Sequence, residues 1–252
     1  MPDAVAWVPR ARFDTDPPGT LSAQLPAHLA LGVRAMVNTV DCTAMTRAVL
    51  DARAQWTADF GGEQHSLGRA FYTHLETGQS GLYFADAAAS DARVERVLPG
   101  LQSRMRETLA RMLGAEVTAR SGWCGAGVHV FEPRGKVARV GGVMHFDTEG
   151  LTRYQCASRA PAVTLVLMLC PAARGGGLRL WDVVFEGRPD TDLDDDALAA
   201  AARRTLRYRA GDAVLMDSYR LHQIAPFSGD APRVSATLHA VAVGDGLWES
   251  WF

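Results

Sequence analysis

Two imidazoles and one carboxylate in this 252-residue chain are spaced so that they could hold a metal ion. His145 and Asp147 stand two positions apart in the segment Gly-Gly-Val-Met-His-Phe-Asp. If that segment is extended, residues i and i+2 face the same side, so both side chains point to one place. His222 follows far downstream and would complete a set of three ligands. Two neutral imidazoles and one carboxylate suit Fe(II) and leave adjacent coordination positions open, which is typical of a catalytic site.

Further short motifs precede and follow these three residues along the chain. An Arg-x-Ser pair, Arg233 and Ser235, begins about ten residues after His222. Three flanking segments complete the pattern: Pro-x-Val-Thr-Leu at 161–165, Gly-Gly-Gly-Leu-Arg-Leu-Trp at 175–181 and Gly-Asp-Ala-Val-Leu-Met-Asp at 211–217. This order of His-x-Asp, His and Arg-x-Ser resembles the Fe(II)- and 2-oxoglutarate-dependent oxygenases. The resemblance covers roughly residues 123–243, about half of the chain.

The resemblance implies both the ligands and the reaction. His145, Asp147 and His222 would be the catalytic metal ligands for Fe(II), and Arg233 would anchor the co-substrate 2-oxoglutarate. A guanidinium suits the distal carboxylate because it offers forked, charged donors, and Ser235 on the same strand face could add a hydroxyl. The alternative interpretation of Arg233 and Ser235 is a surface ion pair and a solvated hydroxyl.

The implied enzyme is a 2-oxoglutarate-dependent dioxygenase that consumes dioxygen and releases succinate and CO2. Its simplest activity is hydroxylation of an unactivated C–H bond of a small molecule, such as an amino acid or a secondary metabolite. Desaturation, ring formation and epimerisation stay open. So do two other functions: a non-catalytic cupin-type protein that binds a metal or small ligand, and an oxygenase that acts on a protein or nucleic acid. The oligomeric state is not indicated.

Substrate contacts are harder to identify than metal ligands. Five candidates follow the metal segment or lie on adjacent segments, although core packing or solvation would explain each equally well: Trp123, Thr148, Glu149, Tyr154 and Trp181. For His129 we favour a hydrogen-bonded core position over a place facing the ligand. His239 shares a strand face with Arg233 but lies about 20 Å along the strand, so we do not expect it to replace His222.

The elements that must position these residues change in kind near residue 115. Helical spacing of apolar residues predicts helices over 38–60 and 98–113, the second stopped by Gly114. Short β-like runs follow at 128–131, 137–146, 163–169, 178–185, 205–208, 213–216, 220–224 and 234–243. A helical insertion is expected near 192–204, and 71–84 could be a lid or an outer strand pair.

These elements predict a mainly β fold with flanking α-helices, a double-stranded β-helix of the jelly-roll or cupin-like type. We expect one oxygenase domain over 1–252. Residues 1–115 would form a mainly helical lead-in and support, and residues 116–245 the core.

Composition excludes several other classes of protein. The chain is 48% hydrophobic and 21% charged with a net charge of -2, and it has no basic stripe, so nucleic-acid binding is not expected. The longest apolar run, 162–170, is too short to span a membrane. The single lysine, Lys136, precedes Val137 and cannot form a P-loop. The N-terminus lacks the features of an export signal, so we expect a cytoplasmic location.

Overall fold

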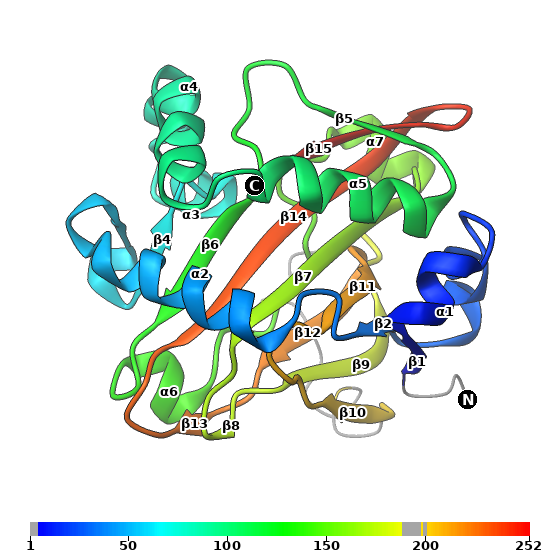
Figure 1. Ribbon diagram of the computed structural model, residues 1–252. Helices are drawn as coiled ribbons and strands as arrows, with labels where there is room; N and C mark the ends of the chain where they lie inside the picture. Colours follow the sequence, from blue (N-terminus) through cyan, green and yellow to red (C-terminus); the bar gives the residue numbers. More distant parts are fainter. Residues whose placement is uncertain (1–4, 188–197, 199–200) are drawn as a thin grey trace.

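The largest element of the fold is a mixed sheet, which contains ten strands within the described part of the chain (Figure 1). The computed structural model describes residues 5–187, 198 and 201–252. Across the sheet the strands follow in the order β1 (Ala6–Pro9), β2 (Leu31–Arg34), β11 (Ala213–Asp217), β7 (Ala162–Cys170), β14 (Arg233–Gly244), β6 (Gly127–Phe131), β4 (Gln64–Leu67) and β3 (Thr57–Asp59). Beside the far half of β14 lies β15 (Leu247–Trp251), which also pairs with β5 (Glu116–Ala119).

A smaller sheet packs against one face of this large sheet. It consists of β10 (Arg203–Leu206), β9 (Leu178–Val184) and β12 (Arg220–Ile224), and a two-stranded ribbon joins β8 (Arg174–Gly175) to β13 (Phe227–Ser228). Buried side chains of β7 and β11 form one cluster with Leu178 and Leu180 of β9. The space between the two sheets is called the interior here, and the site described below lies in it.

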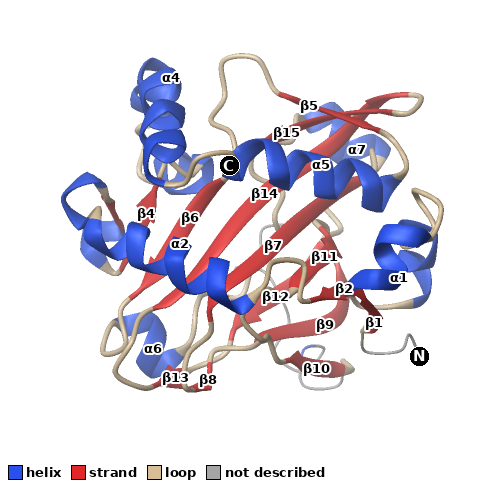
Figure 2. Ribbon diagram, in the orientation of Figure 1, coloured by secondary structure: helices blue, strands red, loops and turns tan. Residues whose placement is uncertain are grey.

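Helices α2 (Thr39–Asp51) and α5 (Leu101–Leu113) lie across the opposite face of the large sheet (Figure 2). The other described helices are α1 (Arg10–Thr15), α3 (Phe71–Glu76), α4 (Ser80–Val97), α6 (Lys136–Val140) and α7 (Arg153–Ser158), with 3-10 turns at Ser22–Ala27, Arg53–Gln55 and Phe60–Gly62. The main core cluster joins Val49 of α2 and Leu109 of α5 to Leu165 of β7 and Leu238 of β14. None of the described helices is long and apolar enough to cross a membrane.

Strand β14 shows how the sheet separates apolar from polar side chains. Val234, Ala236, Leu238 and Ala240 belong to the core cluster beneath the helices. Side chains alternate along a strand, so the other residues of this stretch face the interior: Arg233, Ser235, Thr237 and His239. All of these interior residues are buried. One strand thus supplies apolar contacts to the helices and polar groups to the site.

The two helices expected from apolar spacing are both present, but the first is shorter than expected. Helix α2 begins after Asn38, whose side chain accepts a hydrogen bond from the backbone N–H of Asp41, and it ends at Asp51. The chain then enters β3, because Thr57–Asp59 pairs with β4 at the sheet edge. Helix α5 ends as expected at Gly114, which has a φ of 65°. Residues 71–84 form α3 and the start of α4, so of the two alternatives for this segment, a lid or an outer strand pair, the strand pair is wrong.

The expected strand over 137–146 is also wrong. Its first part is α6, and the chain then turns at Gly141, which has a φ of 92° and would place a Cβ 2.8 Å from the carbonyl oxygen of Ile224. The expected helical insertion at 192–204 lies mostly outside the described residues, and its end, Arg203 and Arg204, belongs to strand β10. Residues 1–115 contribute strands as well as helices: β1 and β2 lie at one edge of the large sheet, and β4 and β3 at the other.

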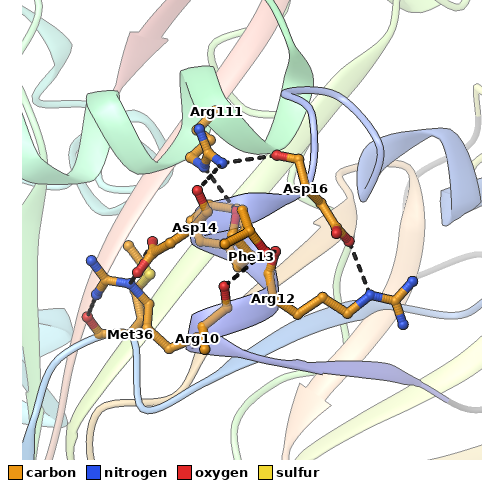
Figure 3. Close-up of polar contacts among 9 residues, drawn as sticks. Arg10, Arg12, Phe13, Asp14, Asp16, Met36 and Arg111 are labelled. Carbon is orange, nitrogen blue, oxygen red and sulfur yellow. Dashed lines mark hydrogen bonds and ion pairs between the residues drawn. The ribbon is translucent and has the colours of Figure 1, made fainter.

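A single arginine fastens the N-terminal helix α1 to α5 (Figure 3). Arg111 of α5 donates hydrogen bonds to the carbonyl oxygens of Phe13 (2.9 Å), Asp14 (2.7 Å) and Asp16 (2.8 Å). Beside it lies a surface hollow of about 450 Å³ that shares no residue with the site described next. Arg10, at its rim, is already bonded to Asp14 at 2.7 Å and to the carbonyl oxygen of Met36. Three of the charged residues around this hollow, Arg10, Asp14 and Arg111, are therefore used in holding α1 in place.

Candidate metal centre

His145, Asp147 and His222 come together in the interior. One ligand atom from each lies within 4.8 Å of the other two. The Nε2 atom of His145 is 3.5 Å from Oδ1 of Asp147, and the Nε2 atom of His222 is 3.4 Å from Oδ2. Asp147 and His222 are buried, whereas the side chain of His145 is 34% exposed. The sequence prediction that these three side chains converge is confirmed, and the cluster is open to one side.

Backbone pairing brings the two histidines side by side. His145 and His222 exchange two N–H to carbonyl hydrogen bonds of 3.0 Å each, as directly opposed residues of antiparallel strands do. Their side chains therefore lie on the same face, with ring centroids 4.2 Å apart. Two residues on, the backbone N–H of Asp147 donates to the carbonyl oxygen of Ser218 at 2.9 Å. The segment that carries His145 and Asp147 thus runs along β12.

Both histidines are held with Nε2 free to bind a metal. Nδ1 of His145 lies 2.9 Å from the carbonyl oxygen of Val143, and Nδ1 of His222 lies 2.9 Å from that of Arg220. A carbonyl oxygen only accepts hydrogen bonds, so each Nδ1 must carry the hydrogen. In the neutral form of each ring the lone pair is then on Nε2, on the side of Asp147, and this outer hydrogen bond is the arrangement that orients metal-bound histidines.

The charge of the cluster is concentrated on Asp147. Burial raises the pKa of this carboxyl, but the charges of His222, His239 and His145 outweigh burial and hold the pKa well below its ordinary value. Burial lowers the pKa of His222 to about 4 despite the attraction of Asp147. At His145 burial also acts to lower the pKa, yet the hydrogen bond and charge of Asp147 raise it to about 9. An ionised carboxylate between two imidazoles is a donor set that favours a divalent cation.

Arg233 forms a second feature of the interior. It is 2% exposed, and its Nε donates to the carbonyl oxygen of Gly176 (3.0 Å) while its Nη1 donates to Oγ of Ser235 (3.1 Å). The guanidinium lies between the rings of Phe131 and Tyr208, at 5.5 and 5.8 Å from their centroids. Burial lowers its pKa. A buried cation is costly unless an anion accompanies it, and among the described residues no carboxylate is paired with Arg233.

Tyr208 adds a second polar group beside Arg233. Its buried hydroxyl has no hydrogen-bond partner in the described part of the chain, and its ring lies beside the guanidinium. Leaving a buried hydroxyl without a partner costs free energy, so a hydroxyl and a guanidinium together suit a carboxylate ligand. The glycine segment at 175–176 turns the chain, with φ of 74° at Gly175 and 67° at Gly176, and the carbonyl oxygen of Gly176 accepts the hydrogen bond from Arg233.

The candidate substrate residues have different surroundings. Thr148 and Glu149 follow Asp147 and are half-buried. Burial and the charge of Asp147 raise the pKa of Glu149 to about 7, so this carboxyl lies close enough to the His145, Asp147 and His222 cluster to interact with its charges. Trp123 is half-buried and packs against Phe71, with ring centroids 4.4 Å apart.

The other two substrate candidates, Trp181 and Tyr154, do not contact the His145, Asp147 and His222 cluster. Trp181 is buried against Phe146 and Leu221. It follows Leu180, which is paired with His222, so the Trp181 side chain is on the opposite face of the small sheet and its role is packing. Tyr154 lies on α7 and is 81% exposed.

Several interior residues were missed or interpreted differently from the sequence. His129 is paired with Ser235 across the strands and so faces the interior, with Nδ1 unpartnered among the described residues. Burial, with the charges of His239 and Arg233, lowers its pKa to about 3. Tyr72, on α3, lies 5.8 Å from His129 between ring centroids and accepts a hydrogen bond from Gln64. The strand parity of Gly127–Phe131 could have indicated His129, but no local signal indicates Tyr72.

His239 is nearer to the cluster than its distance from Arg233 suggested. His222 completes the three-ligand group, in agreement with the sequence. However, Nδ1 of His239 lies only 3.9 Å from Oδ2 of Asp147. His239 is the seventh of the twelve residues of β14, so distance from Arg233 at the start of the strand was the wrong measure of distance from the His145, Asp147 and His222 cluster.

No family model matches the chain, and no curated protein matches it. Solved structures do share its fold. An N-substituted L-amino acid dioxygenase from Burkholderia ambifaria AMMD, in complex with alpha-ketoglutarate (2-oxoglutarate), is 17% identical with a TM-score of 0.53 over 86% of this chain and 84% of that one. The non-heme alpha-ketoglutarate-dependent epimerase SnoN from nogalamycin biosynthesis is 17% identical with a TM-score of 0.57 over 92% and 83%. SnoN has also been solved with Fe3+, alpha-ketoglutarate and nogalamycin RO.

A third structure covers the chain almost completely. It is an oxidoreductase of the 2OG-Fe(II) oxygenase family from Burkholderia pseudomallei, 12% identical with a TM-score of 0.52 over 98% of both chains. The structural neighbours are thus Fe(II)/2-oxoglutarate-dependent enzymes, and the His-Asp-His cluster that the sequence indicated is present in this chain.

Proposed function

We propose that this chain is an Fe(II)- and 2-oxoglutarate-dependent oxygenase whose two packed sheets form a double-stranded β-helix. The observation that carries the proposal is the combination of two features in one interior. The His145, Asp147 and His222 cluster has the donor set of a facial triad. On the same interior face of β14 as His239, which adjoins that cluster, lies a buried Arg233 with no carboxylate partner among the described residues.

Each residue of the proposed site has a separate task. His145, Asp147 and His222 would hold the iron, while Arg233, Ser235 and Tyr208 would bind the distal carboxylate of 2-oxoglutarate. Bound iron would supply dioxygen activation, coupled to oxidative decarboxylation of 2-oxoglutarate to succinate and CO2. The hydrogen bonds from Nδ1 of both histidines keep the two rings oriented in the absence of metal, so little reorganisation is needed on binding.

The proposed reaction is hydroxylation of an unactivated C–H bond of a small molecule. The named substrates of the structural neighbours are small molecules, an N-substituted L-amino acid and a nogalamycin compound. Thr148 and Glu149 are the candidate substrate contacts nearest to the ligands in the chain, and Trp123 is a third. Because SnoN is an epimerase, an outcome other than hydroxylation is a second result that product analysis would identify.

A metal- or ligand-binding protein without catalysis is the main alternative function. Such a protein would have no use for a buried guanidinium without a carboxylate partner in the same interior, so Arg233 favours the oxygenase. For action on a protein or nucleic acid, no feature of the described residues offers specific support.

The test is an anaerobic titration of the Fe(II)-loaded protein with 2-oxoglutarate, followed in the visible region. We expect the weak charge-transfer band of a 2-oxoglutarate chelate, and succinate release once dioxygen is admitted. Arg233→Gln should weaken this band. Arg179→Gln is its matched control, because Arg179 is a half-buried arginine bonded to Gln223 at 3.1 Å and not to the site. A protein that binds iron but gives neither the band nor succinate would be a binding protein, and the oxygenase proposal would be wrong.

A further inference from the structure

A buried hydroxyl holds one oxygen of the Asp147 carboxylate. Oγ1 of Thr164, on β7, lies 2.6 Å from Oδ2 of Asp147. The same hydroxyl oxygen lies 3.1 Å from Oγ of Ser218 and 3.0 Å from Nδ1 of His239. Thr164, Ser218 and His239 are all buried. Thr164 therefore has three polar neighbours and no access to bulk water.

The direction of each hydrogen bond follows from counting hydrogens. A hydroxyl donates one hydrogen bond and accepts two. A carboxylate that binds a metal is deprotonated and can only accept, so the Thr164 hydroxyl must donate to Asp147. Both other neighbours must then donate to Thr164, which requires the hydrogen of His239 to be on Nδ1. Every donor and acceptor of Thr164 is used, and the two incoming bonds strengthen the outgoing one.

His239 is itself fixed in place. It is the direct cross-strand partner of Thr164 between β14 and β7, so the two side chains lie on the same face. On its other side the imidazole stacks on Trp251 of β15, with ring centroids 6.0 Å apart and an interplanar angle of 29°. Trp251 is held in turn by the guanidinium of Arg120, 4.4 Å from the ring centroid. Packing from β15 thus determines the orientation of the imidazole that donates to Thr164.

We infer that Thr164 and His239 are positioning residues that fix the orientation of the Asp147 carboxylate for metal binding, an inference that rests on the proposed metal site. A carboxylate oxygen has two lone-pair positions, so Oδ2 can still accept a second partner beside Thr164. The short hydrogen bond from Thr164 opposes rotation of the carboxylate, because rotation would move Oδ2 away from the hydroxyl. In this orientation Oδ1 lies 3.5 Å from Nε2 of His145 and Oδ2 lies 3.4 Å from Nε2 of His222.

The test uses Co(II) in place of Fe(II), so that binding and ligand geometry are read without turnover. Thr164→Val removes the hydroxyl with little change of shape, and Thr164→Ser restores it. For Thr164→Val we expect the Kd for Co(II) to rise about 10- to 100-fold, as for other outer-shell substitutions, and the visible d–d spectrum to change. Thr164→Ser should recover most of the affinity and the wild-type spectrum. Thr118→Val is the matched control, because Thr118 is a half-buried threonine on β5 bonded to the carbonyl oxygen of Trp248.

Two results would overturn the inference. One is a folded Thr164→Val protein with the affinity and spectrum of the wild type. The other is equal loss of affinity in Thr164→Val and Thr164→Ser, which would show that the hydroxyl is not what matters. If Thr164→Val does not fold, the pair His239→Asn and His239→Leu decides. The amide of Asn can still donate to Thr164 and should keep the spectrum, whereas Leu should not; equal behaviour of the two would contradict the inference.

The wild-type protein separates this inference from the proposed function. If it binds neither Co(II) nor Fe(II), the proposed function fails and the inference fails with it. If it binds metal and 2-oxoglutarate while Thr164→Val is unchanged, only the positioning role is wrong.

Discussion

Asp147 is the residue that connects the two sheets at the proposed site. Its backbone is bonded to Ser218 beside the small sheet, and its carboxylate accepts from Thr164 of the large sheet. The two histidine Nε2 atoms lie 3.5 and 3.4 Å from that carboxylate. Because each ligand is fixed by its own hydrogen bond, single substitutions should remove one interaction at a time.

Replacement of His222 by alanine should remove one of the three metal ligands. Outer-shell substitutions cost about 10- to 100-fold in metal affinity, so we expect the Kd for Fe(II) to rise by more than about 100-fold when a direct ligand is lost. Anaerobic competition with a metal-binding dye measures the change. His65→Ala is the control, because His65 packs against Trp56 with ring centroids 5.6 Å apart and is not part of the cluster. Normal iron binding by His222→Ala would show that His222 is not a ligand.

Replacement of Arg233 by glutamine should weaken 2-oxoglutarate binding and leave Fe(II) binding nearly unchanged. Loss of one partner of a buried charge pair costs about 2 to 5 kcal/mol. Titration of the charge-transfer band at increasing 2-oxoglutarate concentration gives the affinity, with Arg179→Gln as the control. A variant that loses iron but keeps its affinity for 2-oxoglutarate would instead assign Arg233 a structural role.

At the scale of elements, the edge strand β3 is joined to α3 through a buried carboxyl. Oδ1 of Asp59 accepts a hydrogen bond of 3.1 Å from Thr73, and Oδ2 has no partner within the described residues. Burial raises the pKa of Asp59 to about 6, although its hydrogen bonds and Arg69 act in the opposite direction. The folded protein therefore holds this proton more tightly than the unfolded chain does.

This carboxyl should make stability fall as pH rises from about 4 to about 6. In the unfolded chain an aspartate titrates near pH 3.9, so across this window the folded state binds more protons and the free energy of unfolding decreases. The difference between the two pKa values corresponds to about 3 kcal/mol. Asp59→Asn still accepts from Thr73 and carries no charge, so it should be more stable than the wild type above pH 6 by up to about this amount.

Urea unfolding at pH 4 and pH 7 measures this effect. We expect the advantage of Asp59→Asn to be present at pH 7 and to shrink toward zero at pH 4. The exposed Asp51→Asn variant should show no such dependence on pH. A difference between Asp59→Asn and the wild type that stays constant across this pH range would contradict the prediction.

At the scale of the whole molecule, the two faces of the large sheet have separate tasks. Helices α2 and α5 pack on one face, and the proposed site lies on the other. The hydrogen bonds from Arg111 to the backbone of Phe13, Asp14 and Asp16 therefore lie on the face of the sheet that is away from the proposed site (Figure 3). Changes there should alter stability without altering metal binding.

Arg111→Met should destabilise the fold while leaving the metal affinity intact. Methionine retains much of the packing of the arginine stem but loses three hydrogen bonds to backbone carbonyls, two of which are half-buried. At about 0.5 to 1.5 kcal/mol for each bond, with a reduction for exposure, we expect a loss of about 2 kcal/mol in urea unfolding. Arg104→Met, on the exposed face of the same helix, is the control. An accompanying loss of Co(II) binding would show that the two sides of the sheet are coupled.

The sequence by itself determined the parts of the site that depend on local periodicity. The two-residue spacing of His145 and Asp147, and the alternation along β14 that sets Arg233 and Ser235 on one face, follow from strand geometry. The stop of helix α5 at Gly114 follows from the left-handed backbone conformation that favours glycine. These features require no knowledge of which strands are neighbours.

Only the tertiary structure decided which distant residues meet. Thr164 and His239 become partners because β7 and β14 pair in one register, and Tyr72 reaches His129 because α3 follows β4, which pairs with the strand that carries His129. Residues 137–146 have the apolar content of a strand but begin with α6, because Gly141 turns the chain close to Ile224 before His145 pairs with His222. Sheet register and packing are non-local, and a one-residue change of register would bring a different set of side chains to the metal.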